Sequence, residues 1–278
     1  MREVGRIEVV ELFPELDAQL IPLLRGLREE DWARLAVGAW TVKDVAAHLL
    51  DSAIRRLSFD RDRLPLVPPD GPIEGYADLV AFLNDLNHVW VRAMKRVSPR
   101  LLTDFLEKVG AELSEHMAGL DPSGPALFSV AWAGEETSES WFDVAREYTE
   151  RWHHQQQIRE AVGAPGLTSR RLMHPVLDAF LRALPHAYRS VEAEEGTAVA
   201  VEIAGEAGGE WGLVREGGRW RLYEGAPEAP KARVRMDQDT AWRRMTKGIT
   251  REQAAERSQV TGEARLGEPV FGMLSVMA

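Results

Sequence analysis

The chain has 278 residues, enough for one large domain or two ordinary ones, and its apolar (45%) and charged (28%) fractions are those of a globular protein. A net charge of -10 argues against the basic surface that nucleic-acid-binding proteins present to phosphates. No apolar run reaches the ~20 residues needed to span a bilayer, and the first residues lack the features of a signal peptide. We therefore expect a cytoplasmic protein, monomer or homodimer, that binds neither nucleic acid nor membrane.

The sequence contains no cysteine. Disulfides, thiolate metal ligands and a cysteine nucleophile are therefore excluded. It also lacks a phosphate loop, a dinucleotide fingerprint and a nucleophile elbow. Any thiol chemistry would need a thiol supplied by a cosubstrate.

Residues 8–187 are predicted to be mostly helical, because their apolar residues recur at helical spacing. Two helix starts carry clear signals. Thr41 and Asp44 form a capping-box pattern, and Ser98 followed by Pro99 supplies a cap and a proline at the first helical position. The predicted helices cover residues 9–23, 41–57, 76–97, 98–113, 139–162 and 169–184, the last interrupted at Pro175.

The pattern changes after residue 190, where short alternating segments typical of strands replace the long helical repeats. The fold class is therefore α+β with two domains: a helical domain over residues 1–189, a linker over 190–196 and a small domain over 197–278 whose sheet is mixed or antiparallel. In the small domain, strands are predicted at residues 197–203, 211–215, 219–223 and 231–236, with a hairpin turn at 216–218, and helices at 239–246, 251–258 and 267–277.

Three residues of the helical part are candidate metal ligands. Glu150 and His154 are four residues apart and so share one face of a helix. His48, on another helix, could complete a site with three protein ligands and one open position, which is typical of catalytic rather than structural zinc.

An alternative is that this polar face of helix 139–162 simply lies in water, opposite the bulky face that includes Tyr148 and Trp152. The metal interpretation requires that both faces of this helix be covered. Further candidates near the site or for substrate binding are Asp51, His153 as a substitute ligand, Gln157, and Arg243 with Arg244 for a substrate carboxylate. Asp51 could orient His48, although a solvated aspartate is the more usual case at such a position. The pattern identifies no catalytic acid, base or nucleophile.

Two motifs resemble those of the DinB-like metal-dependent four-helix-bundle superfamily. Residues 40–49, W-T-V-K-D-V-A-A-H-L, are similar to the helix that carries its first metal ligand, and the pattern E-x-x-x-H-x-x-Q-I from Glu150 is similar to the later helix that carries the other two. Among these proteins, the mycothiol-dependent maleylpyruvate isomerase-like group is the nearest in pattern. The resemblance implies that His48, Glu150 and His154 are the ligands, with Gln157 standing where an aspartate is usual.

The C-terminal residues resemble the sterol-carrier-like domain found in the same isomerase-like proteins. The similarity lies in two segments, A-W-R-R-M-T-K-G at residues 241–248 and V-T-G-E-A-R-L-G at residues 260–267. The isomerases often carry an arginine directly after the first of these glycines, where this chain has Ile249. We therefore expect poor activity on maleylpyruvate.

The resemblance implies a divalent metal, zinc first and nickel, iron or manganese as alternatives, and a mycothiol- or bacillithiol-like thiol as cosubstrate. The expected activity is thiol transfer to a small electrophile or its thiol-assisted isomerisation. The alternative is a non-catalytic, metal-containing protein that binds a small or apolar molecule.

Overall fold

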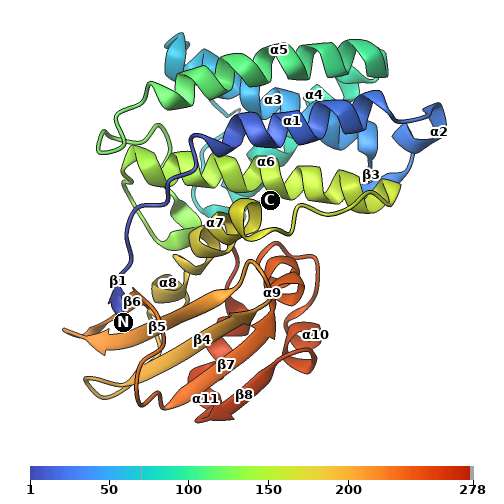
Figure 1. Cartoon of the computed structure of the whole chain (residues 1–278). Helices are drawn as coiled ribbons and strands as arrows, with labels where there is room; N and C mark the ends of the chain where they lie inside the picture. The colour runs from blue at the N-terminus through green and yellow to red at the C-terminus, as the bar shows by residue number, and fades with distance from the viewer. Residues whose placement is uncertain (70, 276–278) are drawn as a thin grey trace. The chain divides into compact units, whose positions relative to one another are not determined.

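The computed structural model describes residues 1–69 and 71–275. It combines many helices with a mixed six-stranded sheet, which confirms the predicted mixture of helix and strand. The chain forms two compact units (Figure 1). The helical unit comprises residues 9–127 and 147–167; the sheet unit comprises residues 1–8 and 128–146 and the described residues from 168 onward.

The division differs from the predicted domain limits, which ended the helical domain at residue 189. Residues 168–189 fall in the sheet unit because helix α7 (Arg170–Leu181) packs on α9 (Gln238–Met245) and α8 (Leu184–Ala187) packs on strand β6 (Arg219–Glu224). Helix α6 (Ser140–Val162) contributes its first residues to the sheet unit and its last sixteen, 147–162, to the helical unit.

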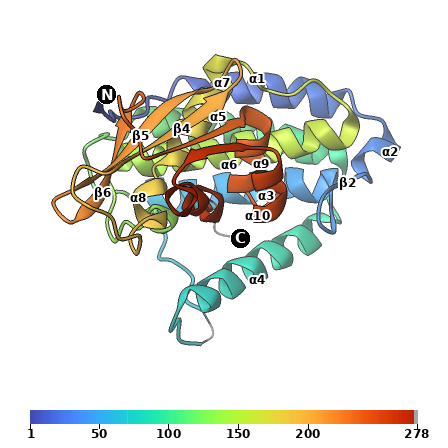
Figure 2. The same ribbon diagram turned by 90° about the horizontal axis from the view of Figure 1, so that it is seen from below.

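Long helices build the helical unit. In it α3 packs against α4 and α5, and α5 also packs against α1 (Figure 1). Figure 2 shows α4 as the outermost of these helices. Leucine and valine side chains of α1, α3 and α5 form its core, among them Leu24, Val45 and Leu106. The elements are α1 (Leu12–Arg25), α2 (Glu29–Trp32), a hairpin of β2 (Leu35–Val37) and β3 (Trp40–Thr41), α3 (Val42–Arg56), a π-helical turn (Leu57–Arg61), α4 (Tyr76–Met94), α5 (Pro99–Ala118) and residues 147–162 of α6.

The predicted helix starts are confirmed by their capping contacts. The Asp44 backbone N–H donates to Thr41 Oγ1 (3.3 Å), and the Thr41 N–H donates to Asp44 Oδ2 (3.0 Å), so both orphan donors of the first turn are satisfied. At α5, Ser98 Oγ accepts from the Leu101 N–H (3.3 Å) and Pro99 is the first helical residue. The first cap sets where α3 begins, and so fixes His48 in its second turn.

The sheet unit contains six strands in the order β1-β6-β5-β4-β7-β8. Among the strands of the described residues, only β4 and β7 pair in parallel, so the sheet is mixed, which is one of the two predicted alternatives. The predicted hairpin joins β5 to β6 through Gly217 and Gly218, whose φ values of 59° and 76° require glycine-like freedom and match a two-residue hairpin turn. The strands are β1 (Arg2–Glu3), β4 (Ala198–Ala204), β5 (Gly209–Glu216), β6, β7 (Ala232–Asp237) and β8 (Gln259–Gly262), and the remaining helices are α10 (Arg251–Glu256) and α11 (Ala264–Gly267), with 3₁₀ turns at Ala131–Ala133 and Glu268–Gly272.

Three details of the sequence prediction are wrong. Pro175 lies inside α7 without interrupting it. Strands β1, β2, β3 and β8 were not predicted, because strands of two to four residues carry little periodicity and are defined by their partners. The helix predicted at 267–277 is instead the short α11 followed by a 3₁₀ turn; residues 276 and 277 lie outside the described residues.

None of the described helices is long and apolar enough to cross a membrane.

Candidate metal centre

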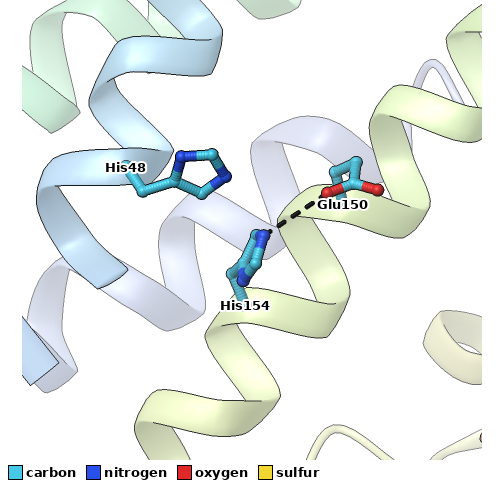
Figure 3. A group of neighbouring side chains, drawn as sticks. All are labelled: His48, Glu150 and His154. Carbon is cyan, nitrogen blue, oxygen red and sulfur yellow. Dashed lines mark ion pairs between the residues drawn. The ribbon is translucent and has the colours of Figure 1, made fainter. Parts of the chain in front are cut away.

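Three side chains of the helical unit converge on one point. His48 projects from α3, and Glu150 and His154 project from successive turns of α6 (Figure 3). One ligand atom from each lies within 4.8 Å of the others. Glu150 Oε2 is 3.3 Å from His154 Nε2, and the ring centroids of His48 and His154 are 4.7 Å apart. The arrangement could hold a metal ion, and the three ligands would leave a further coordination position open.

Both faces of α6 are covered in the helical unit, as the metal interpretation requires. Tyr148 and Trp152 are fully buried on the bulky face. On the opposite face, the side chains of Glu150 and His154 are only 26% and 14% exposed, far less than on a free helix surface. The alternative in which this polar face simply lies in water is therefore wrong.

Gln157 holds the two neighbouring histidines of α6 in different roles. Its Oε1 is 2.9 Å from His154 Nδ1, so this nitrogen donates and Nε2 is the nitrogen that faces Glu150. Its Nε2 lies 3.0 Å from His153 Nε2, which must accept. The lone pair of His153 Nε2 is thus occupied by an amide, and His153 does not belong to the metal-binding group.

The environment of His48 favours the neutral imidazole that binds metals. Burial lowers its pKa to about 3, and the positive charges of His154 and Arg55 act in the same direction against the opposing effect of Glu150. Its Nδ1 is buried and has no hydrogen-bond partner in the described part of the chain. A buried polar atom without a partner costs free energy, so the ring fits a role in binding something further.

Asp51 lies one turn after His48, but its partner is Arg55, whose Nη2 is 3.2 Å from Asp51 Oδ2. Among the described residues no hydrogen bond joins it to His48, so the orienting contact is not made. The solvated position is wrong as well, because Asp51 is buried. Burial raises the pKa of the Asp51 carboxyl. Arg55 Nη2 also donates to Asn87 Oδ1 of α4 (3.1 Å).

Arg243 and Arg244 belong to the sheet unit and have partners there. Arg243 Nε donates to Asp239 Oδ2 (2.8 Å), and its guanidinium lies 4.7 Å from the Trp242 ring centroid. Arg244 Nε donates to the Phe271 carbonyl (2.5 Å). These contacts give each arginine a structural role, and its function as a carboxylate binder stays a prediction.

Two neighbours of the centre were missed by the sequence interpretation. The ring centroid of Trp40, in β3, is 5.3 Å from that of His48. Arg55 lies two turns after His48 on the same face of α3. The seven-residue spacing was readable in the sequence and could have identified Arg55.

The different roles of the two adjacent histidines can be tested by substitution. We expect His154→Ala to lower the affinity for zinc by more than about 100-fold, since it removes a ligand, and His153→Ala by at most about tenfold, since it removes only a contact of Gln157. Titration with a competing chelator measures both. A larger loss in the His153 variant would show that the ligand assignment on α6 is off by one residue.

The chain matches no protein-family model and no curated protein sequence.

Proposed function

We propose that this protein is a metal-dependent enzyme that uses a low-molecular-weight thiol to modify a small electrophile, by transfer or by isomerisation. The observation that carries the proposal is the group of His48, Glu150 and His154, whose ligand atoms lie within 4.8 Å of one another. Two imidazoles and one carboxylate suit zinc or another first-row divalent ion. The thiol must come from outside because the chain has no cysteine.

The scaffold is consistent with the motifs that led to this interpretation. The ligands come from α3 and α6, the helices that contain the two DinB-like motifs, and α3 begins with the capping box of the first motif. We propose that the helical unit is a DinB-like four-helix bundle and that the sheet unit is a sterol-carrier-like domain. A mycothiol- or bacillithiol-like cosubstrate follows from that resemblance, and Ile249 favours an electrophile other than maleylpyruvate.

The residues of the chain prepare the site for such a reaction. A divalent ion bound there would favour the thiolate form of a coordinated thiol, which is the nucleophilic form. His48 is held neutral by burial, and the contact of Gln157 Oε1 with His154 Nδ1 leaves Nε2 of His154 directed toward Glu150. The ring of Trp40 lies against that of His48, which is buried (ring centroids 5.3 Å apart).

The experiment uses cobalt as a spectroscopic substitute for zinc. We expect one of the thiols mycothiol, bacillithiol, glutathione and coenzyme A to produce a sulfur-to-cobalt absorption band, because the open position can accept its sulfur. The same thiol should react with halogenated or unsaturated acceptors only when metal is present, and both signals should be lost in His48→Ala. If every thiol leaves the spectrum unchanged and no acceptor reacts, the non-catalytic binding protein becomes the better interpretation.

A further inference from the structure

One face of α3 carries two buried polar atoms that have no partner in the described part of the chain, His48 Nδ1 and Arg55 Nε. Asp51 lies between them on the same stripe of the helix, and its Oδ2 forms an ion pair with Arg55 Nη2 (3.2 Å). Because buried polar atoms almost always have partners, the two atoms at the ends of this stripe suggest a polar ligand that extends along α3 from the metal centre.

Arg55 is the charged end of this stripe. The separation of seven positions between His48 and Arg55 corresponds to about 10 Å along the helix axis. Helical side chains lean toward the N-terminus, so the guanidinium of Arg55 reaches back toward His48, over Asp51. The Arg55 side chain is 28% exposed as a whole, while its Nε is buried, so the exposed part of the side chain lies beyond Nε.

The guanidinium is already held in place. Its Nη2 contacts Asp51 Oδ2 (3.2 Å) and Asn87 Oδ1 (3.1 Å), and its Nε has a hydrogen still to donate. A fixed guanidinium loses little side-chain entropy when it binds a carboxylate, and such charge-assisted hydrogen bonds are strong. Its position and chemistry therefore suit the anionic end of a molecule whose other end reaches the metal centre.

We propose that Arg55 binds a carboxylate of the small molecule that occupies the metal centre. The substrates would then be anionic molecules in which several bonds separate the metal-binding atom from the carboxylate. This inference rests on the proposed metal centre. It does not require that the metal-binding atom be sulfur, because either the thiol or the electrophile could carry the carboxylate.

A purely structural role for Arg55 is the competing explanation. Through Asn87 it joins α3 to α4, and through Asp51 it neutralises a buried carboxylate. A structural arginine would affect stability without discriminating between ligands. The test must therefore measure preference for a charged end, with stability followed separately.

The first measurement uses calorimetry on the zinc-loaded protein, with dicarboxylates from glutarate to suberate compared with their monomethyl esters. One carboxylate can reach the metal in both compounds, but only the diacid offers a second to Arg55. We expect the diacid of the best length to bind about 10- to 100-fold more tightly than its ester, and Arg55→Gln to abolish this preference. Arg61→Gln should retain it, since Arg61 lies in the π-helical turn after α3, is exposed, and pairs with Asp62 and with Glu112 of α5.

Arg55→Gln leaves Asp51 without its partner and could unfold, so the double variant Asp51→Asn/Arg55→Gln provides a neutral replacement for the pair. A wild-type protein that shows no preference for any diacid, with or without zinc, overturns the inference, as does a preference that persists in a folded Arg55 variant. The cobalt-loaded protein is then titrated with 3-mercaptopropionate and 3-mercaptopropanol to identify the source of the carboxylate. Failure of both thiols to bind, together with a diacid preference that depends on Arg55, refutes the thiol chemistry and leaves the anion site supported.

Discussion

Replacing His48 with alanine is expected to reduce the affinity for a divalent ion by more than about 100-fold. Removing a residue that only hydrogen-bonds to a metal ligand typically lowers the metal affinity about 10- to 100-fold, and removing the ligand itself should lower it further. His48 is the only member of the group supplied by α3, so its loss leaves Glu150 and His154 as a two-ligand site on one helix. Metal content after dialysis against a limiting chelator, measured by elemental analysis, gives the result.

His88→Ala is the matched control for this prediction. His88 lies on α4 and is exposed, and its ring contacts that of Trp40 (centroids 6.2 Å apart), as does the ring of His48. It is not part of the metal-binding group. Both variants should keep their helix content by circular dichroism. Equal metal in the wild-type protein and the His48 variant would contradict the ligand assignment.

The features that the sequence predicted well depend on neighbours in the chain. The start of α3 follows from Thr41 and Asp44, three residues apart, and the shared face of Glu150 and His154 follows from their spacing of four. The β5–β6 hairpin follows in the same way from two adjacent glycines between alternating segments. Each rule requires only helical or strand geometry, so one sequence is enough to apply it.

The features that escaped prediction depend on contacts between distant segments. Strand β1 exists because Arg2 and Glu3 pair with β6, more than 200 residues away. The covering of the second face of α6 could not be derived from the residues of α6, because a stripe of polar residues does not indicate whether another helix packs over it. Arg55 donates a hydrogen bond to Asn87 of α4, and the spacing of residues along α3 gives no means to predict a partner on another helix.

Helix α6 is rich in polar residues, and its buried position depends on an ion pair between residues that are far apart in the sequence. Arg151 follows Glu150 directly, its side chain is 3% exposed, and it donates to Asp17 of α1, whose side chain is 16% exposed. Gly110 of α5 gives this pair room: a Cβ there would stand 2.5 Å from Asp17 Oδ2. The pair therefore joins α1 to α6, close against Gly110 of α5 and next to the residue that supplies the carboxylate ligand.

Breaking this pair from one side should be strongly destabilising. Arg151→Met leaves the Asp17 carboxylate in a largely buried position without its cation, a change that typically costs about 3 kcal/mol or more. A loss of that size should lower the melting temperature by roughly 6 °C or more in a protein of this size. Thermal unfolding followed by circular dichroism measures the shift.

The double variant Asp17→Leu/Arg151→Met distinguishes a broken charge pair from a damaged core. If the cost of Arg151→Met is that of an unpaired carboxylate, removing the carboxylate as well should recover much of the stability, because apolar replacement of a buried ion pair is often close to neutral. Two losses that simply add would show that Arg151 acts through packing alone. In that case the position of α6, and with it the geometry of Glu150 and His154, would depend on the apolar face of Tyr148 and Trp152 rather than on this ion pair.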